Sequence, residues 1–134
     1  TRRSSDLSEP GDADAVATAL REAQEEIGLD PALPEVLGRM PVYTTVTRFQ
    51  VTPVVALLPD RLDLQPDPAE VAEVFQVPLA FLMNPAHHRR HQMTVEGQVR
   101  RFLSMPWSAP DGREYFIWGA TAAMLRNLYH LLAD

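Results

Sequence analysis

The sequence contains neither cysteine nor lysine. Without cysteine the chain forms no disulfide and offers no thiolate for catalysis or metal binding, which fits the reducing cytoplasm. All twelve basic residues are therefore arginine, whose guanidinium suits bidentate contacts with phosphate. No apolar run is long enough to span a membrane, and residues 1–6 lack the apolar stretch of a signal peptide. We therefore expect a cytoplasmic protein without a membrane partner.

Basic residues are fewer than acidic residues in this chain. Twelve basic residues stand against eighteen acidic ones, which gives a formal net charge of −6. This balance argues against binding of nucleic acid through a basic face. It leaves room for a small molecule that carries phosphate, provided that metal ions neutralise the site. With 134 residues, 46% of them apolar, the chain has the size and the core material of one domain.

Negative charge is concentrated in residues 21–29, Arg-Glu-Ala-Gln-Glu-Glu-Ile-Gly-Leu. Offsets of three and four residues place Glu22, Glu25 and Glu26 on one arc of a helix. The opposite arc is apolar and is expected to face a core: Val16, Ala19, Leu20, Ala23 and Ile27. The three carboxylates repel one another, and Arg21 supplies only one positive charge. The pattern therefore indicates either a site for a divalent cation or an acidic helix face in water.

Periodicity and turn residues predict the other elements of the chain. Helices are expected at 12–28, with Asp12 or Asp14 as its cap and Gly28 at its end, at 79–83 and at 119–132. Strands are expected at 36–40, 43–49, 50–58, 98–107 and 114–118. Pro53 marks an edge position or a bulge, because proline has no N–H for a sheet ladder. Residues 68–75 are expected to form a turn or a short helix, and residues 87–91 a basic loop.

Strands interleaved with a few helices favour the α/β (α+β) class, with a mixed sheet between helical layers. Four aromatic residues near the C-terminus are expected in the core rather than stacked on an adenine ring: Trp107, Tyr115, Phe116 and Trp118. The apolar candidates of the last helix are Ala123, Leu125, Leu128, Leu131 and Leu132.

Residues 21–29 resemble the second half of the Nudix box: Arg-Glu, an apolar residue, any residue, Glu-Glu, any residue, Gly and an apolar residue. So many fixed positions in so short a string make the resemblance far more specific than a lone glycine-rich loop. Four further segments are similar to the coenzyme A pyrophosphatase branch of the Nudix hydrolases, at 1–7, 50–55, 70–79 and 117–122. The resemblance implies one domain over residues 1–134, with the Nudix fold of a mixed sheet sandwiched between helices.

The activity implied by this resemblance is hydrolysis of the pyrophosphate bond of coenzyme A or its derivatives. The products are 3′,5′-ADP and 4′-phosphopantetheine, and the cofactor is Mg²⁺ or Mn²⁺. Glu22, Glu25 and Glu26 are then the metal ligands, and Arg21 orients the carboxylates. The catalytic set is Arg21, Glu22 and Glu25 from the box together with Glu70 or Glu73 from the later segment, and the general base stays open between Glu22 and that later pair.

Substrate contacts are expected from two pairs of arginines. Arg2 and Arg3 are candidates for the 3′-phosphate of coenzyme A, and Arg89 and Arg90 are candidates for a phosphate-facing loop. An ordinary solvated loop is the alternative for the second pair. The neighbouring histidines are poor candidates for a metal site because their spacing matches no common zinc site: His87, His88 and His91.

The first half of the Nudix box departs from the family pattern. Counting back from Arg21 places Ala13 where the family has a further Glu and Leu7 where the box begins with Gly. The Phe-Pro-Gly-Gly turn of the family is absent as well. We therefore expect that residues have been skipped between Leu7 and Ser8, and that the first strands of the family precede Thr1. If Leu7 and Ser8 are joined directly, the box lacks a glycine whose carbonyl contributes to the metal site, and activity is in doubt.

Two other functions stay open. The box alone does not separate coenzyme A from another nucleoside diphosphate derivative, such as ADP-ribose, NADH or a dinucleotide. A Nudix-fold binding module without hydrolysis is the alternative of a different class, although it has no need of three clustered carboxylates. The sequence also leaves the oligomeric state open, with a homodimer among the options.

Overall fold

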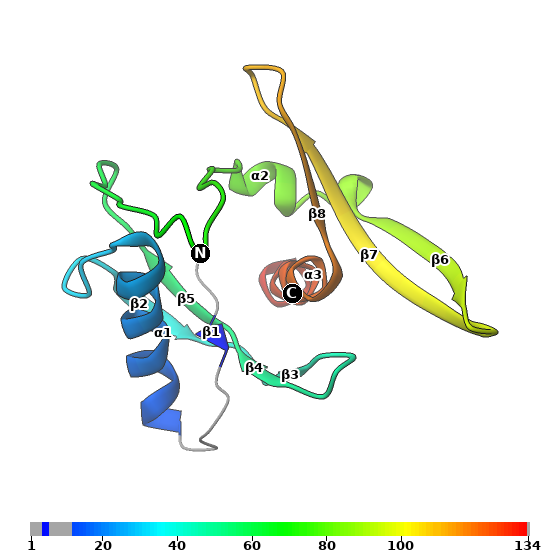
Figure 1. The fold of residues 1–134 in the computed structure, drawn as a ribbon, viewed down its shortest axis with the longest axis horizontal. Helices are drawn as coiled ribbons and strands as arrows, with labels where there is room; N and C mark the ends of the chain where they lie inside the picture. Colours follow the sequence, from blue (N-terminus) through cyan, green and yellow to red (C-terminus); the bar gives the residue numbers. More distant parts are fainter. Residues whose placement is uncertain (1–3, 6–11, 134) are drawn as a thin grey trace. The chain divides into compact units, whose positions relative to one another are not determined.

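The computed structural model describes residues 4–5 and 12–133, with side chains from residue 15 onward. The chain divides into two compact units, Thr1–Phe75 and Gln76–Asp134, and each is described by itself (Figure 1). In its described residues, the first unit contains one helix and five strands: β1 (Ser4–Ser5), α1 (Asp12–Ile27), β2 (Glu35–Arg39), β3 (Tyr43–Thr44), β4 (Gln50–Thr52) and β5 (Val54–Leu57). The second unit contains α2 (Leu79–Leu82), the 3₁₀ turn η1 (Pro85–His87), β6 (Arg89–Val95), β7 (Gln98–Ser108), β8 (Glu114–Trp118) and α3 (Gly119–Ala133).

Helix α1 confirms the predicted helix at 12–28. Gly28 ends it with a φ of +70°, and its N–H donates to the Gln24 carbonyl oxygen at 3.0 Å. Three residues of the predicted apolar arc are buried, Ala19, Ala23 and Ile27, and Ala15 joins them. The larger Val16 and Leu20 are only half-buried at the edge of this arc.

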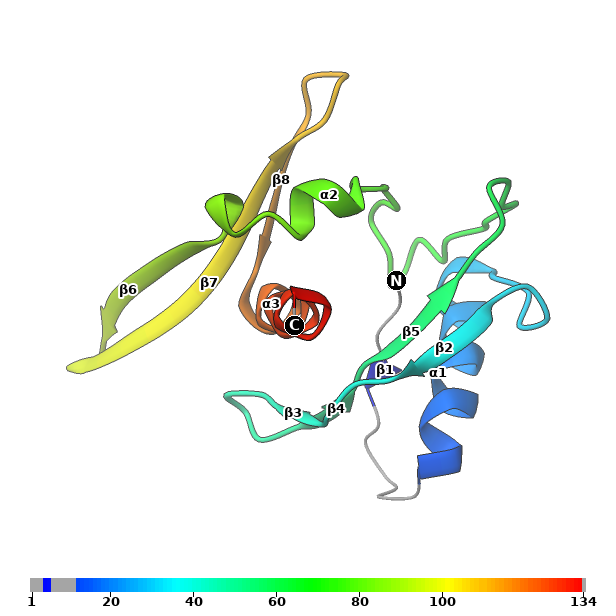
Figure 2. The ribbon, with the colours of Figure 1, turned by 180° about the vertical axis from the view of Figure 1, so that it is seen from behind.

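Proline divides the predicted strand at 50–58 into two. Strand β4 pairs with β1 and β3, whereas β5 pairs with β2 (Figure 2). Between them Pro53 has no N–H to donate, and its carbonyl oxygen accepts a hydrogen bond from the Met40 N–H at 2.9 Å. The predicted irregularity at Pro53 is therefore confirmed, and it is the point where the chain passes from one sheet to the other.

The predicted strand at 43–49 is wrong beyond Thr44. The Thr45 N–H donates to the Phe49 carbonyl oxygen at 2.8 Å, and the Thr45 Oγ1 accepts the Phe49 N–H at 3.0 Å. These bonds close a loop in which Arg48 has a φ of +69°. Threonine favours strands by its branching, but here its hydroxyl satisfies a backbone donor locally, which competes with a sheet ladder.

The second unit confirms the predicted hairpin at 98–107 and 114–118. Strand β7 pairs with β8 on one side and with β6 on the other, in the order β6-β7-β8. The predicted loop at 87–91 is wrong from Arg89 onward, because β6 begins there. Helix α2 and helix α3 confirm the predicted helices at 79–83 and 119–132. One face of the sheet packs on them through Met105, Leu82 and Ala122.

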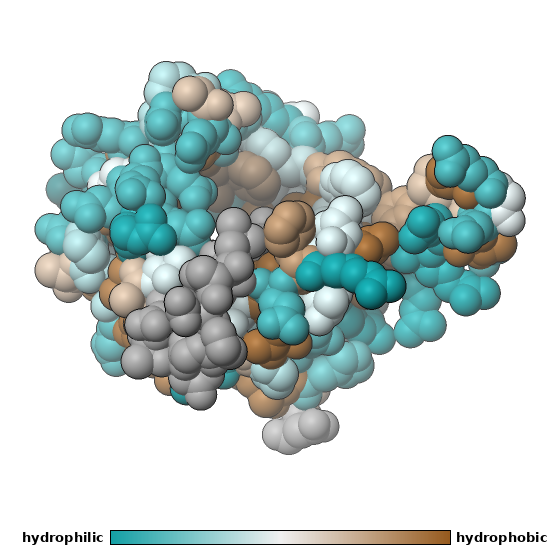
Figure 3. All heavy atoms as spheres, turned by 60° about the horizontal axis from the view of Figure 1, so that its bottom comes forward, coloured by the Kyte–Doolittle hydropathy of each residue, from teal (hydrophilic) through white to brown (hydrophobic). Residues whose placement is uncertain are grey.

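Some residues expected in the core of this unit lie at the surface. Phe116 and Trp118 are 55% and 57% exposed, and Leu131 and Leu132 are 59% and 60% exposed. In α3 the predicted Leu128 is buried, and it is joined by Ala122 and Met124, which were not predicted. Apolar residues are also exposed on the β6–β7 hairpin, where brown atoms lie among teal ones at the right of Figure 3: Met93, Val95 and Val99.

These elements confirm the α/β (α+β) class, whereas the expected mixed sheet is not seen among the described strands. Every strand pair in the described part of the chain is antiparallel, in sheets of the order β1-β4-β3, β2-β5 and β6-β7-β8. Among the same residues, no helix has both the length and the apolar character that crossing a bilayer requires.

Candidate functional site

The predicted carboxylates lie in the C-terminal half of α1. Glu22 and Glu26 are four residues apart and half-buried, beside the buried Ala23 and Ile27. Glu25 points more fully into water, and its Oε1 accepts a bond from the Arg21 Nη1 at 3.2 Å. Because both side chains of this pair are about 60% exposed, at 60% and 61%, it contributes little stability. Arg21 therefore contacts Glu25, and its role in orienting the carboxylates stays a prediction.

The position of these charges is electrostatically unfavourable for the helix. The carbonyl end of a helix carries a partial negative charge, which favours cations and disfavours anions. The last turn of α1, all of it described, contains no basic residue. Glu22 and Glu26 also form a like-charged pair at four-residue spacing, which destabilises a helix. Binding of a metal ion by these carboxylates stays a prediction.

A loop from the same unit holds this end of α1 in place. The Gln65 N–H donates to the Ile27 carbonyl oxygen and the Asp67 N–H donates to the Glu26 carbonyl oxygen, each at 2.8 Å. Below these bonds an apolar cluster joins the helix to the loop: Ala23, Ile27 and Leu29 with Leu58, Leu62, Leu64 and Val71. The last carbonyls of α1 are thus satisfied by the loop, which fixes the backbone that carries Glu26.

Asp67 connects this anchored loop to Glu70. The Asp67 Oδ1 accepts the Ala69 N–H at 2.9 Å, and its carbonyl oxygen accepts the Glu70 N–H at 3.0 Å. This is an aspartate turn, so the predicted segment at 68–75 is a turn and contains no helix. The backbone of Glu70 is therefore linked to that of Glu26 through one residue. Glu73 lies beyond the turn and is exposed.

Gly28 permits the close approach of this loop. A Cβ on Gly28 would lie 3.0 Å from the Gln65 backbone nitrogen and 3.2 Å from its carbonyl oxygen. Gly28 also has a positive φ, which other residues adopt only at a cost. We expect Gly28→Ala to lower the free energy of unfolding by more than about 1 kcal/mol, the cost of αL strain alone. Urea unfolding followed by circular dichroism measures this change.

Gly112→Ala is a matched control for this variant. Gly112 also has a positive φ, of +92°, but a Cβ there meets no atom within 4 Å. The difference between the two variants reports the contact with Gln65 alone. Equal losses of stability would show that the loop does not press on the helix end.

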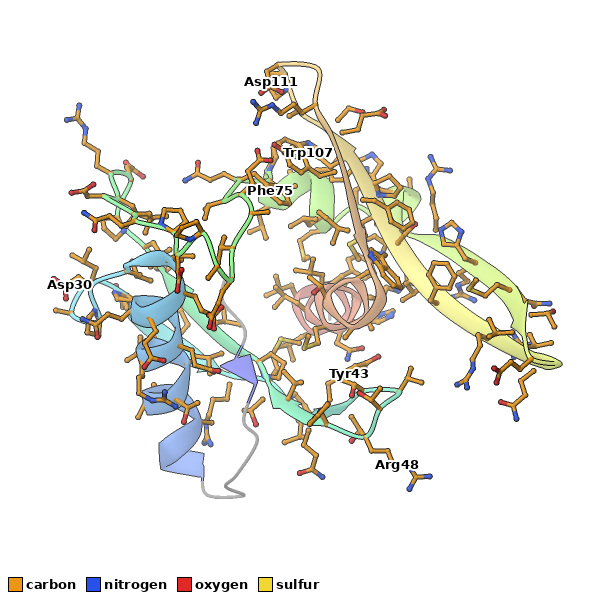
Figure 4. The ribbon with its side chains drawn as sticks, viewed as in Figure 1. Asp30, Tyr43, Arg48, Phe75, Trp107 and Asp111 are labelled. Atoms are coloured by element: carbon orange, nitrogen blue, oxygen red, sulfur yellow. The ribbon has the colours of Figure 1, made fainter. Side chains whose placement is uncertain are left out.

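Asp30 is a further carboxylate close to the end of α1. Figure 4 labels it in the loop that follows the helix. Its Oδ1 accepts the Ala32 N–H at 2.9 Å, which closes the turn before β2. The Asp30 side chain thus stabilises a turn. The candidate site therefore consists of the helix carboxylates Glu22 and Glu26.

Several predicted site residues are not brought together. Among residues 15–133, no three carboxylate or imidazole side chains converge closely enough to hold a metal ion by themselves. Arg2, Arg3 and the Leu7–Ser8 junction lie outside the described residues. Arg89 and Arg90 lie in the other unit on β6, where neighbouring side chains point to opposite faces of the sheet. Their contact with a phosphate stays a prediction, and only one of the two can face a given ligand.

The histidines next to them make other contacts. The His87 ring stacks on Phe81 with centroids 4.0 Å apart. His88 Nε2 lies 2.6 Å from the Leu82 carbonyl oxygen, and its Nδ1 lies 2.8 Å from the Arg126 Nη1. His88 therefore connects the segment after α2 to α3.

Sequence reasoning missed the role of Asp67. The signal was present, because aspartate before Pro68 and Ala69 is typical of a turn in which the side chain accepts a backbone N–H. That Asp67 also binds the last turn of α1 depends on two segments about forty residues apart in the chain, and no local pattern reports such a contact.

Comparison with known proteins identifies the family of this chain. A family model described as the NUDIX domain matches residues 6–97. The Uncharacterized Nudix hydrolase NudL of Escherichia coli strain K12 is 38% identical over 117 residues, which cover 87% of this chain and 58% of that protein. The NudL proteins of Citrobacter koseri and Salmonella paratyphi B are 38% and 39% identical with the same coverage. The chain spans little more than half the length of these relatives. The matched residues include the whole of α1 and the loop that anchors it, and the chain belongs to the Nudix family.

Proposed function

We propose that this chain is the catalytic part of a metal-dependent pyrophosphohydrolase that cleaves the pyrophosphate bond of coenzyme A or its derivatives. The observation that carries the proposal is the placement of Glu22 and Glu26. Both are half-buried and four residues apart, on the half of α1 whose end is anchored by the loop through Asp67. Two carboxylates at this spacing can supply oxygen ligands to a divalent cation.

The donor set suits Mg²⁺ or Mn²⁺. These ions prefer oxygen ligands, and Mg²⁺ in particular is held by one or two carboxylates together with water and substrate phosphates. Glu22 and Glu26 supply the two carboxylates, and Glu25 supplies a third if it leaves Arg21. When bound, the metal neutralises the phosphoryl oxygens and lowers the pKa of an attached water.

The residues of the chain orient the reacting groups. The backbone of Glu26 is held by Asp67, which limits the movement of the carboxylates during the reaction. Glu70 follows Asp67 in the same turn and is our candidate for the general base, ahead of Glu73 and Glu22. Arg21 restrains the Glu25 carboxylate through the bond at 3.2 Å. Arg2, Arg3, Arg89 and Arg90 stay candidates for the substrate phosphates.

We propose coenzyme A as the substrate, ahead of other nucleotides, because of the sequence around the box. The segments at 50–55, 70–79 and 117–122 resemble the coenzyme A pyrophosphatase branch, and they include β4, the turn with Glu70 and the start of α3. The relatives named above carry only the name Nudix hydrolase, so they support the reaction type. A cytoplasmic location is part of the same proposal, because the absence of cysteine fits a reducing compartment.

A substrate panel tests the proposal. Coenzyme A, dephospho-coenzyme A, ADP-ribose and NADH are incubated with the protein and Mg²⁺ or Mn²⁺, and the products are separated by chromatography. We expect hydrolysis of coenzyme A to 3′,5′-ADP with the highest kcat/KM, and loss of all activity when EDTA removes the metal. A higher kcat/KM for ADP-ribose or NADH would support the reaction type and contradict coenzyme A as the substrate.

A non-catalytic binding module is the second function to consider. The first half of the Nudix box, with its glycine, is absent from the sequence, and this favours binding without hydrolysis. Calorimetric titration separates the two functions. Saturable binding of a nucleotide without any product, in the presence of Mn²⁺, would support the binding module and overturn the hydrolase.

A further inference from the structure

One arginine and two histidines join the segment after α2 to helix α3. Arg126 lies on α3, and its Nη1 is 2.8 Å from the His88 Nδ1. Its Nε–H donates to the His130 Nε2 at 3.1 Å, one helical turn further along α3. The second ring nitrogen of His88, Nε2, lies 2.6 Å from the Leu82 carbonyl oxygen. We call Arg126, His88 and His130 the arginine–histidine cluster.

The hydrogen-bond partners of the two rings determine where their protons lie. A guanidinium has N–H donors and no acceptor, so each ring nitrogen that contacts Arg126 carries a lone pair instead of a proton. A carbonyl oxygen only accepts, so the proton of the His88 ring is on the Nε2 that faces Leu82. Both histidines are therefore neutral in this arrangement, and Arg126 is the charged member of the cluster.

The described elements of the second unit add no carboxylate to the cluster. Helix α2 has no ionisable side chain. Helix α3 adds Tyr129, whose ring lies 5.5 Å from the Arg126 guanidinium and meets His88 edge-on at 5.4 Å. The 3₁₀ turn η1 adds His87, and β6 begins with two arginines. The described carboxylates of this unit lie in or beside the turns of the two hairpins instead: Glu96, Asp111 and Glu114.

We propose that the arginine–histidine cluster is a pH-dependent contact, which holds α3 on the segment after α2 near neutral pH and releases it in mild acid. A proton on His88 Nδ1 or His130 Nε2 removes the lone pair that accepts an Arg126 N–H. It also places two cations within hydrogen-bond distance of each other, with no described carboxylate of the unit beside them.

The direction of the pH effect follows from these bonds. The contact is present while the rings are neutral, and it is lost as the pH falls through the range in which histidine takes up a proton. The stability that the contact contributes is therefore present at the higher pH and lost at the lower pH. The proposal does not depend on the hydrolase activity proposed above, because none of these residues belongs to that site.

Replacing His88 with Gln tests the contact without a titrating ring. A glutamine amide has a donor for the Leu82 carbonyl oxygen and an acceptor for Arg126, but it takes up no proton in this range. Between about pH 8 and pH 5, the melting temperature of the wild type is expected to fall by at least about 3 °C more than that of His88→Gln. Differential scanning calorimetry of the full chain measures both.

His87→Gln is the matched control. His87 precedes His88 and is also half-buried, but its ring bonds to the Phe81 carbonyl oxygen and stacks on the Phe81 ring instead of contacting Arg126. This variant is expected to show the same pH dependence as the wild type. A wild type that loses no more stability in acid than His88→Gln overturns the proposal. So does a His87→Gln variant whose pH dependence equals that of His88→Gln.

NMR signals of the ring nitrogens test the cluster without any substitution. At about pH 8 the His88 ring is expected to carry its proton on Nε2 and the His130 ring on Nδ1, because Arg126 contacts the other nitrogen of each. A proton on His88 Nδ1 at that pH overturns the proposal.

Amide hydrogen exchange reports the release of α3. After correction for the intrinsic rates, exchange at residues 126–133 of the wild type is expected to be on the order of tenfold faster at about pH 5 than at about pH 8. In Arg126→Met, which has no guanidinium to release, the corrected rates are expected to be equal at the two pH values. Corrected rates in the wild type that do not change with pH overturn the proposal, and so does an equal acceleration in Arg126→Met.

Discussion

Replacing Glu26 with Gln is expected to lower the turnover of the proposed substrate by at least about 100-fold, the upper end of the loss seen when a metal site loses even an outer partner. Glu26 lies on the half-buried side of α1, and its backbone is fixed by the Asp67 N–H at 2.8 Å. Its carboxylate therefore cannot be replaced by a neighbour through a small movement of the helix. Steady-state kinetics with Mg²⁺ and Mn²⁺ measure the loss.

The same variant is expected to be slightly more stable than the wild type when no metal is present. It removes an anion from the carbonyl end of α1, which amounts to about 0.3–1 kcal/mol. Added Mg²⁺ is expected to raise the melting temperature of the wild type, because a ligand that binds the folded state stabilises it. Added Mg²⁺ is expected to raise the melting temperature of Glu26→Gln much less.

Glu35→Gln is the matched control for this prediction. Glu35 is an exposed carboxylate on β2 and lies outside the proposed site. Its replacement is expected to leave both turnover and the effect of Mg²⁺ unchanged. If Glu26→Gln is as active as this control, Glu26 is not a metal ligand. A loss of stability in Glu26→Gln would contradict the electrostatic account of the helix end.

Replacing Leu128 with Ala is expected to lower the free energy of unfolding by about 2–5 kcal/mol, the range for buried leucines. Leu128 is 5% exposed and is among the buried residues of α3. Removing its branched end leaves a cavity that the surrounding side chains fill only in part. Urea unfolding followed by circular dichroism gives the change.

Leu131→Ala gives the comparison on the same helix. Leu131 is 59% exposed, so its replacement is expected to cost less than about 1 kcal/mol. The two variants make the same chemical change in the same helix, so the helix propensities cancel. Similar losses at both positions would show that the surface of α3 around Leu131 is buried in solution, which would reinstate the core expected from the sequence.

Elements with a local signal were predicted well. The helix α1 was predicted with its end, because an apolar arc and Gly28 lie within one short segment. The β7–β8 hairpin was predicted for the same reason, since its turn residues lie between two strands of alternating pattern. The strand expected at 43–49 failed because Thr45 closes a loop with Phe49, a bond that branching propensity does not describe.

Within the candidate site, the sequence alone determined which side chains of α1 share an arc, because the spacing of residues on a helix is fixed by its geometry. Only the tertiary structure decided that the loop with Asp67 binds the end of α1, and that Gly28 must be small there. It likewise decided that Phe116 and Trp118 lie outside the core. The pattern of β8 shows two faces, but which face is covered depends on where α2 and α3 pack, and that is set by contacts between segments distant in the sequence.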